Sequence, residues 1–384
     1  MKKASLNLLI ALILSGGGDI QASEVIKLQE LDKPAVEWIV DKGTPLYYST
    51  DSRYLNFLGE QIGPEHLEGS EVNLRVSPDA KKRVVSLLES LDQVKEGQRM
   101  TDYYVFDQYD QLEYTVTQGS GVDLKAPVAA ISNDGVLALV DPISAQIQLY
   151  QGGDKIAETP LYRSEGDYSL ERNAFVDWVQ DRCYILIEHP GINGAPARNA
   201  LMISIDAQGR DQITSVLPFT YLLDHVFEDG RFFMSGYSYD PAGPKWTKMI
   251  VETSAQGKIL WTNANFGHEL AISRNGDYLA ARKSHDAVVL FDLARGKVEE
   301  ITFEQDGKVA LGLNVTNRGT VGLIRVPSDF FVKQNSFHSE VFFPQSQSTI
   351  DVELNPRMPA MFQLYCDGHR MMLGTQYEWL EIRE

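Results

Sequence analysis

Short apolar segments alternate with polar turns along most of the chain. The stretch 269–292, ELAISRNGDYLAARKSHDAVVLFD, shows this unit most clearly. It contains three apolar runs, with Asn275-Gly276 between the first two: Leu270–Ile272, Tyr278–Ala281 and Val288–Phe291. An Asn-Gly pair between alternating apolar residues is a strong signal for a β-hairpin. The pattern therefore predicts antiparallel strands joined by tight turns.

Similar turns recur every 43 to 55 residues, each between two apolar runs. They lie at Asp79-Ala80, Asp134-Gly135, Asp181-Arg182, Asp229-Gly230, Asn275-Gly276, Arg318-Gly319 and Asp367-Gly368. A repeat of this length that is built only from strands is typical of four-stranded propeller blades. The alternating helix signals that a parallel sheet requires are missing. We number these repeats as units 1 to 7.

A second hairpin follows the middle turns, where the two outer strands of a blade belong. Its turns lie at Gly152-Gly153, Gln208-Gly209, Gln256-Gly257 and Arg295-Gly296. Each blade is an amphipathic sheet that cannot bury both faces alone, and a ring of blades buries them against neighbours. The predicted fold is all-β, a single β-propeller of seven four-stranded blades.

The last unit is one strand short when the chain ends. We therefore expect an N-terminal strand, from Glu24–Leu28 or Val36–Val40, to complete it and close the ring. The turn Asp41-Lys42-Gly43 resembles the others and makes eight blades the alternative. Only 37 residues separate Gly43 from Ala80, which is short for a blade, so seven is the preferred number.

Three of these segments resemble the repeat of TolB-type propellers with its Ser-Pro-Asp-Gly turn. They are Val76–Glu89 (VSPDAKKRVVSLLE), Ile131–Val140 (ISNDGVLALV) and Ile272–Arg282 (ISRNGDYLAAR). A fourth, Met249–Thr262, ends in GKILWT and is similar to the blade repeat of quinoprotein-type propellers. The resemblance implies a propeller at the level of the superfamily and assigns no function, because one fold serves many functions. A quinone-type redox cofactor would rest on that fourth segment alone, and no cofactor is predicted.

The first 23 residues have the pattern of a secretory signal peptide. Lys2 and Lys3 precede the apolar run Leu6–Leu14, and small residues follow at Ser15–Gly18 and Ala22-Ser23. We expect a signal peptide at 1–23, a propeller domain at 24–384 and a periplasmic or secreted protein. No later stretch has the 18 apolar residues of a membrane span, so the mature chain is not expected to insert.

The net charge argues against nucleic acid as a partner. The formal net charge is −18 and the sequence pI is about 4.8, and an acidic surface repels nucleic acid.

The positions of the cysteines argue against a disulfide. Cys183 and Cys366 are the two cysteines. The repeat places them on opposite sides of the ring, beyond the reach of a disulfide, so we expect two buried thiols.

Long loops in units 3 to 5 suggest a binding face. The loops Thr159–Asn173, Glu188–Asn199 and Tyr237–Trp246 are rich in aromatic, charged, Pro and Gly residues. Aromatic rings beside charged and amide groups suit a sugar or a peptide. The candidate ligand-binding residues are Tyr162, Arg163, Tyr168, Arg172, His189, Arg198, Tyr239, Asp240, Trp246, His268 and His285. An alternative interpretation is that the aromatic residues only cover blade edges.

The sequence contains no nucleophile elbow and no phosphate-binding loop. We therefore expect an exported module that binds a protein partner or a small ligand. The alternative is a carbohydrate-active propeller enzyme, a lyase or hydrolase, with its site at the central channel. It would use Glu188, His189, Asp240, His268 or His285. The histidines lack the local spacing of metal ligands, so no metal site is predicted.

Overall fold

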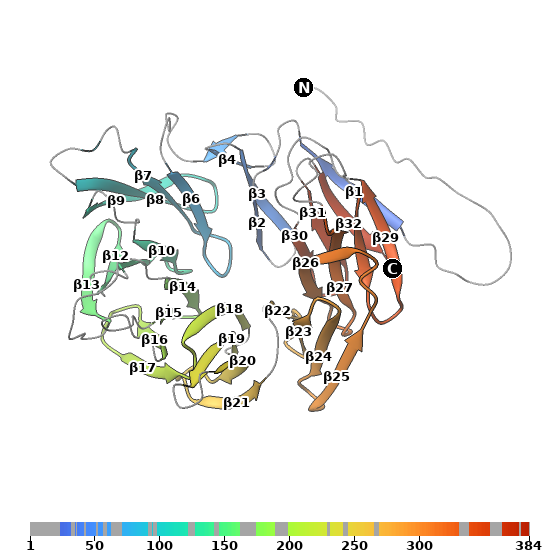
Figure 1. Ribbon diagram of the computed structural model, residues 1–384. Coiled ribbons are helices and arrows are strands. Elements are labelled where there is room, and N and C mark those ends of the chain that lie inside the picture. Colours follow the sequence, from blue (N-terminus) through green and yellow to red (C-terminus); the bar gives the residue numbers. More distant parts are fainter. Residues whose placement is uncertain are drawn as a thin grey trace, which may run out of the picture.

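A computed structural model describes most of the chain as strands arranged around a common centre (Figure 1). The described residues are 24–31, 35, 37–41, 44–50, 53–56, 60–62, 71–90, 94, 98–121, 127–141, 146–161, 174–188, 199–228, 231–240, 245–264, 269–329, 338–353, 363–375 and 378–383. These ranges contain 32 strands and no helix. The expected signal peptide at 1–23 lies outside them.

The strands form eight antiparallel sheets of four, and each sheet is one blade. Blade 1 comprises β2 (Glu37–Asp41), β3 (Thr44–Thr50), β4 (Arg53–Asn56) and β5 (Gln61–Ile62). Blade 2 comprises β6 (Glu71–Val76), β7 (Arg83–Leu88), β8 (Gln98–Phe106) and β9 (Leu112–Gly121). Blade 3 comprises β10 (Val128–Ile131), β11 (Leu137–Asp141), β12 (Gln146–Gln151) and β13 (Asp154–Pro160). Blade 4 comprises β14 (Ala174–Val179), β15 (Arg182–Glu188), β16 (Ala200–Asp206) and β17 (Gln212–Leu217).

The second half of the ring repeats this order. Blade 5 comprises β18 (Tyr221–Glu228), β19 (Arg231–Asp240), β20 (Lys245–Thr253) and β21 (Ile259–Ala264). Blade 6 comprises β22 (Leu270–Ile272), β23 (Tyr278–Ser284), β24 (Ala287–Asp292) and β25 (Lys297–Thr302). Blade 7 comprises β26 (Lys308–Val315), β27 (Val321–Pro327), β28 (His338–Phe343) and β29 (Ser348–Glu353). Blade 8 comprises β30 (Gln363–Cys366), β31 (Met371–Gly374), β32 (Glu378–Arg383) and β1 (Glu24–Glu30).

The propeller has eight blades, so the preferred number of seven is wrong and the alternative of eight is right. The blade that the predicted count of seven leaves out is blade 1, whose two outer strands are only four and two residues long. These short strands explain why its repeat is compressed in the sequence. The predicted units 1 to 7 correspond to blades 2 to 8.

The N-terminal strand closes the ring as the sequence predicts. β1 pairs antiparallel with β32 as the outermost strand of blade 8, in the register Val25 to Ile382. The predicted segment Glu24–Leu28 is therefore the closing strand. Val36–Val40 instead overlaps β2, the innermost strand of blade 1.

The core formed by the described residues is divided into eight apolar clusters, and each cluster lies between two neighbouring blades. Side chains alternate between the two faces of a strand, so one blade contributes to the cluster on each side. In blade 5, Phe232 and Met234 pack against blade 4, whereas Phe233 packs against blade 6. Burial of both faces is what holds the ring together.

Blades 8 and 1 join through two indoles in contact. The Trp38 and Trp379 ring centroids lie 5.2 Å apart, and the Trp38 Nε1–H donates to the Thr375 carbonyl over 2.7 Å. Both indoles are almost fully buried. A Cβ on Gly374 would come within 2.9 Å of the Trp38 ring, so glycine is required for this close approach.

A hydroxyl side chain organises the inner turn of several blades. Four buried residues directly follow the first strand of blades 2, 3, 6 and 7: Ser77, Ser132, Ser273 and Thr316. Each hydroxyl accepts a backbone N–H from the start of the next strand, or just before it, as in Tyr278 N to Ser273 Oγ over 2.9 Å. The fourth residue of each turn has a positive φ, and in blade 2 that residue is Ala80.

Cys183 and Cys366 are both free, on β15 of blade 4 and β30 of blade 8. Cys183 is fully buried as expected. Cys366 is only half-buried, which corrects the expectation of two buried thiols.

We expect Trp38→Ala to lower the free energy of unfolding by roughly 3–5 kcal/mol, because it leaves a large cavity at the closure and an unpaired carbonyl. Denaturant unfolding followed by circular dichroism measures this. Trp246→Ala is the matched control, since Trp246 is 44% exposed and should cost about 1 kcal/mol or less. Equal losses in the two variants would contradict the role of the closure contact.

Ala80→Gly should stabilise the protein by up to about 1 kcal/mol. Ala80 has a φ of 58°, where an L-residue with a Cβ is strained by roughly 1–2 kcal/mol, and part of the gain is offset by the greater freedom of glycine in the unfolded chain. Gly276→Ala at the equivalent turn, where φ is 69°, should change the melting temperature in the opposite direction. The same direction of change for both would refute this account.

Candidate functional site

Four aromatic side chains share one face of blade 5. Tyr221 lies opposite Tyr237 in the β18–β19 pair, and Tyr239 lies opposite Trp246 in the β19–β20 pair. Because Tyr237 and Tyr239 are two residues apart on β19, all four rings point to the same side of the sheet. Phe233, which packs against blade 6, has the same parity, so this is the face toward blade 6.

The four rings contact one another and remain accessible. The Trp246 centroid lies 4.8 Å from Tyr239, 5.4 Å from Tyr221 and 6.2 Å from Tyr237. Trp246 and Tyr221 are each 44% exposed, and the other two are half-buried. We call these four residues the aromatic cluster. The rings thus cover the outer part of this blade face and keep surface that is accessible to solvent.

Charged groups border the aromatic cluster. Lys248 Nζ lies 5.7 Å from the centre of the Tyr237 ring, and Asp240 lies opposite Lys245 at the end of the β19–β20 hairpin. Aromatic faces beside charges can bind apolar groups, sugar rings or cations. Within the hairpin, strands of ten and nine residues hold these groups on a rigid support.

Asp224 lies on the same face of blade 5, at a bulge in β18. Its carboxylate accepts the backbone N–H of Leu270 in blade 6 over 2.7 Å and that of His225 over 2.8 Å. Burial, together with the nearby Glu269 charge, raises the pKa of Asp224 to about 6, although these two N–H groups oppose the rise. The carboxylate thus ties the innermost strands of blades 5 and 6 together.

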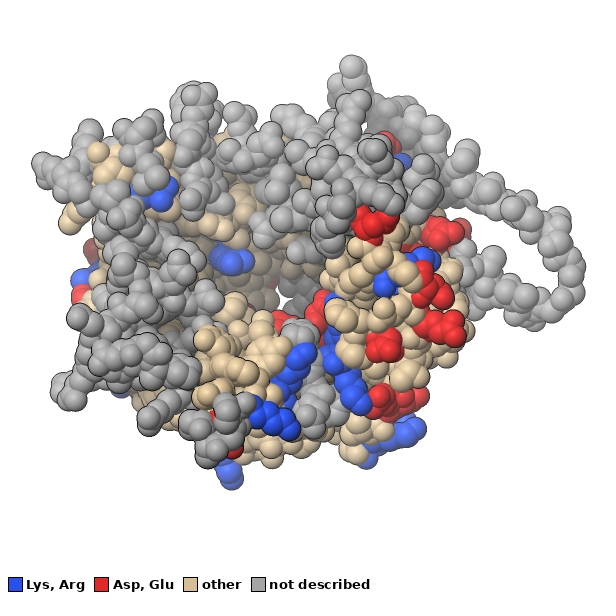
Figure 2. Space-filling model, in the orientation of Figure 1, with Lys and Arg blue, Asp and Glu red and all other residues tan. Residues whose placement is uncertain are grey.

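Two further titratable groups lie on innermost strands. His225 packs its ring 4.7 Å from that of Phe175 in blade 4, and burial lowers its pKa to about 4. Asp177 on β14 keeps access to solvent, yet desolvation by the protein around it raises its pKa to about 6, against the Trp178 N–H and the charge of Arg75. The middle of the ring is hollowed in the space-filling view (Figure 2).

The structure places four of the predicted site residues. Tyr239, Asp240 and Trp246 come together at the β19–β20 hairpin. His285 is exposed in the turn between β23 and β24 of blade 6, and no described contact joins it to them. The remaining candidates lie outside the described residues: Tyr162, Arg163, Tyr168, Arg172, His189, Arg198 and His268. Over the described part of the chain, His, Cys, Asp and Glu form no group of three that could hold a metal ion.

The predicted set omitted Tyr221 and Tyr237. The pairing of β18 with β19 brings both into the aromatic cluster. Tyr237 belonged to a segment that the sequence singled out as a loop. Tyr221 comes to lie opposite Tyr237 through the bulge between Leu222 and Asp224, and a simple alignment of the two strands about the predicted turn would have placed it opposite Ser238. Two cavities lined by described residues lie elsewhere, between blades 6 and 7.

Known proteins share this fold without sharing the sequence. The chain is similar to the C-terminal WD40 domain of Sif2, with 13% identity, a TM-score of 0.52, and coverage of 93% of this chain and 97% of that one. It is also similar to BamB from Moraxella catarrhalis, with 11% identity, a TM-score of 0.52, and coverage of 94% and 98%. These likenesses show a β-propeller and nothing finer. No protein-family model and no curated protein matches the sequence.

The described residues include no helix long and apolar enough to cross a membrane.

The adjacent groups Asp224 and His225 should give opposite dependences of stability on pH. Between about pH 4 and 6, native Asp224 keeps a proton that the unfolded chain has lost, so its contribution to stability falls as pH rises. Between about pH 4 and 6.5, native His225 lacks a proton that the unfolded chain binds, so its contribution rises. We therefore expect Asp224→Asn to make the slope of stability against pH more positive than in the parent, and His225→Gln to make it more negative.

Denaturant midpoints at pH 4.5, 5.5 and 6.5 measure these slopes. The amide that Asp224→Asn introduces keeps an oxygen for the Leu270 N–H, and Asp177 is common to all three proteins. Identical pH profiles for the parent and both variants would show that the two pKa values are not shifted by folding.

Proposed function

We propose that this protein is an exported propeller that binds a partner protein through the aromatic cluster of blade 5 and catalyses no reaction itself. The aromatic cluster is the observation that carries the proposal. Tyr and Trp are enriched among the residues that dominate binding energy at protein interfaces. Here four such rings lie together on three adjacent strands of one blade, and two of them are 44% exposed.

Export is supported by the sequence of residues 1–23, with its charged start, apolar run and small residues. The wider binding face would comprise the loops of blades 4 to 6, which are units 3 to 5 of the repeat. The propeller fold suits such a role, because its loops display many side chains on a closed and rigid ring. A likeness to TolB-type or quinoprotein-type propellers stays a prediction at the level of the repeat.

The alternative of a carbohydrate-active enzyme also stays a prediction. It places Glu188, His189, Asp240, His268 or His285 at the central channel, and His189 and His268 lie outside the described residues. Aromatic rings also stack on sugars, so the aromatic cluster alone fits either ligand. The experiment must therefore separate a protein partner from a glycan.

A photo-crosslinking amino acid in place of Tyr239 should capture one defined protein in the native host. The same probe in place of Val216, which is 58% exposed on blade 4, is the matched control and should not capture it. With that partner purified, Trp246→Ala and Tyr221→Ala should each weaken binding by about 30-fold, as expected for interface residues worth about 2 kcal/mol. Val216→Ala should leave the affinity unchanged.

Two outcomes would overturn the proposal. Variants of the aromatic cluster that bind the captured protein as tightly as the parent would remove the site. Specific binding on a glycan array that is lost in Trp246→Ala, without capture of a protein, would support the carbohydrate alternative.

A further inference from the structure

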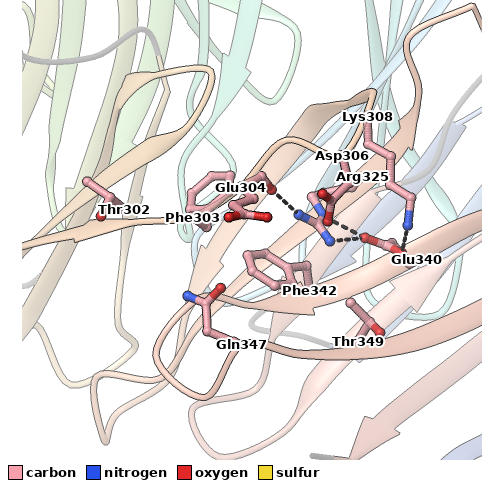
Figure 3. A pocket seen from close by; sticks show the side chains of 10 residues that line it. All are labelled: Thr302, Phe303, Glu304, Asp306, Lys308, Arg325, Glu340, Phe342, Gln347 and Thr349. Carbon is pink, nitrogen blue, oxygen red and sulfur yellow. Dashed lines mark hydrogen bonds and ion pairs between the residues drawn. The ribbon is translucent and has the colours of Figure 1, made fainter.

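A cavity of about 610 Å³ lies between blades 6 and 7, on a different side of blade 6 from the aromatic cluster. Its size is within the range of small-ligand sites. Figure 3 shows its lining, which comprises Thr302, Phe303, Glu304, Asp306, Lys308, Arg325, Glu340, Phe342, Gln347 and Thr349. A second cavity of about 310 Å³ follows the same pair of blades and is lined in part by β25.

The cavity is open because the outer strands of this interface are polar. On β25, Ile301 packs against blade 7, but Lys297 and Glu299, which have the same parity, are exposed. On β29, Thr349 is exposed opposite the buried Phe342. Further in, the Phe303 and Phe342 rings meet at 5.2 Å and close the interface. The two phenylalanines therefore form the floor of the cavity.

Both cations at the floor share one carboxylate as their ion-pair partner. Glu340 forms ion pairs with Arg325 and with Lys308, and Arg325 Nη1 donates to the Glu304 carbonyl over 2.9 Å. The Arg325 guanidinium also lies over the Phe342 ring, 3.7 Å from its centre. Arg325 and Glu340 are each only 4% exposed. This triad is part of the wall and has a net charge of +1. Glu304 and Asp306, which also line the cavity, add two negative charges, so the lining as a whole has a net charge of −1.

The groups that remain are hydrogen-bond acceptors. The Glu304 and Asp306 side chains are exposed and form no ion pair with any described residue. In Figure 3 the Glu304 carboxylate points into the space between Phe303 and Arg325. Gln347 donates its Nε2–H to the Pro344 carbonyl over 2.7 Å, which leaves its Oε1 to face a ligand, and Thr302 and Thr349 add hydroxyls.

The loop that carries the two free carboxylates is fixed at both ends. Lys308 N donates to the Gln305 carbonyl over 2.7 Å, and Ser328 N donates to the Gly307 carbonyl over 2.8 Å. Asp306 has a φ of 49°, a conformation that Asp and Asn tolerate better than most residues. The backbone that carries these acceptors is thus held in place before any ligand arrives.

We propose that this cavity binds a cationic nitrogen group with several N–H donors, a guanidinium or a primary ammonium. Such a group matches the two free carboxylates, the Gln347 oxygen and the hydroxyls in charge and in donor number. Phe303 offers an aromatic surface beside them, which favours a cation as well. Acidic side chains also gather over blades 6 to 8 (Figure 2), and their field attracts cations toward this part of the ring.

The cation can come from a basic side chain of a peptide or from a free polyamine. Two probes distinguish these sources: a short blocked peptide with one arginine, and spermidine. A peptide in which citrulline replaces arginine has the same shape without the charge. Isothermal titration calorimetry at low and at physiological salt measures the affinity of each probe for the purified propeller.

We expect at least one charged probe to bind. The double variant Glu304→Gln/Asp306→Asn should weaken that binding by about 10-fold or more, because both charge-assisted contacts are lost. Asn tolerates the backbone conformation of residue 306, and both carboxylates are exposed, so the melting temperature should not change. The double variant Asp134→Asn/Asp154→Asn in blade 3 removes the same charge at exposed positions and should bind within twofold of the parent.

Three results would overturn the proposal: binding of neither charged probe, equal weakening in the two double variants, or equal affinity for the citrulline peptide. Trp246→Ala serves as a further control, since it removes the blade 5 surface and should leave binding of the cation unchanged. The cavity and the proposed function can therefore fail separately.

Discussion

The structure depends on the burial of both faces of every blade against its neighbours. A four-stranded sheet of this kind has apolar residues on both faces, and no blade could bury them alone. Eight apolar clusters bury these faces between neighbouring blades, and the contact of Trp38 with Trp379 joins blade 1 to blade 8 and so closes the ring. The pairing of β1 with β32 adds backbone hydrogen bonds to the packing that closes the ring. The first and the last strand of the domain thus lie in one blade, blade 8. A defect in that blade exposes its interfaces with blade 7 and with blade 1.

The same constraint explains where candidate sites lie. A residue on a blade face is buried only as far as the neighbouring blade extends. On blade 5 the face toward blade 6 is apolar at Phe233 and Ile250 and then becomes exposed at Tyr239 and Trp246. Between blades 6 and 7 the interface closes at Phe303 and Phe342 and opens further out. Both sites are therefore edges of interfaces, one aromatic and one acidic.

The fold could be predicted because turns carry strong local signals. Asn275-Gly276 and Asp134-Gly135 combine a residue that tolerates a turn with a glycine at positive φ, and the spacing between such turns gives the repeat. Blade 1 was harder to recognise because β4 and β5 together have only six residues, too few to show the period. The aromatic cluster was predicted in part. Tyr239 and Trp246 belong to a segment that the sequence predicted as a loop and that the structure shows as the facing ends of β19 and β20, but Tyr221 joins them only through the register of β18 with β19.

The cavity between blades 6 and 7 could not be predicted, and the reason is physical. Its chemistry depends on which charges are already paired. Lys308, Arg325 and Glu340 are far apart in the sequence, and only the ladder of β26, β27 and β28 brings them together. Glu340 is the ion-pair partner of both cations, so Glu304 and Asp306 form no ion pair with a described residue, and the lining keeps a net charge of −1. A sequence gives the number of charges in a segment, whereas a site is defined by those that remain after the fold has paired the others.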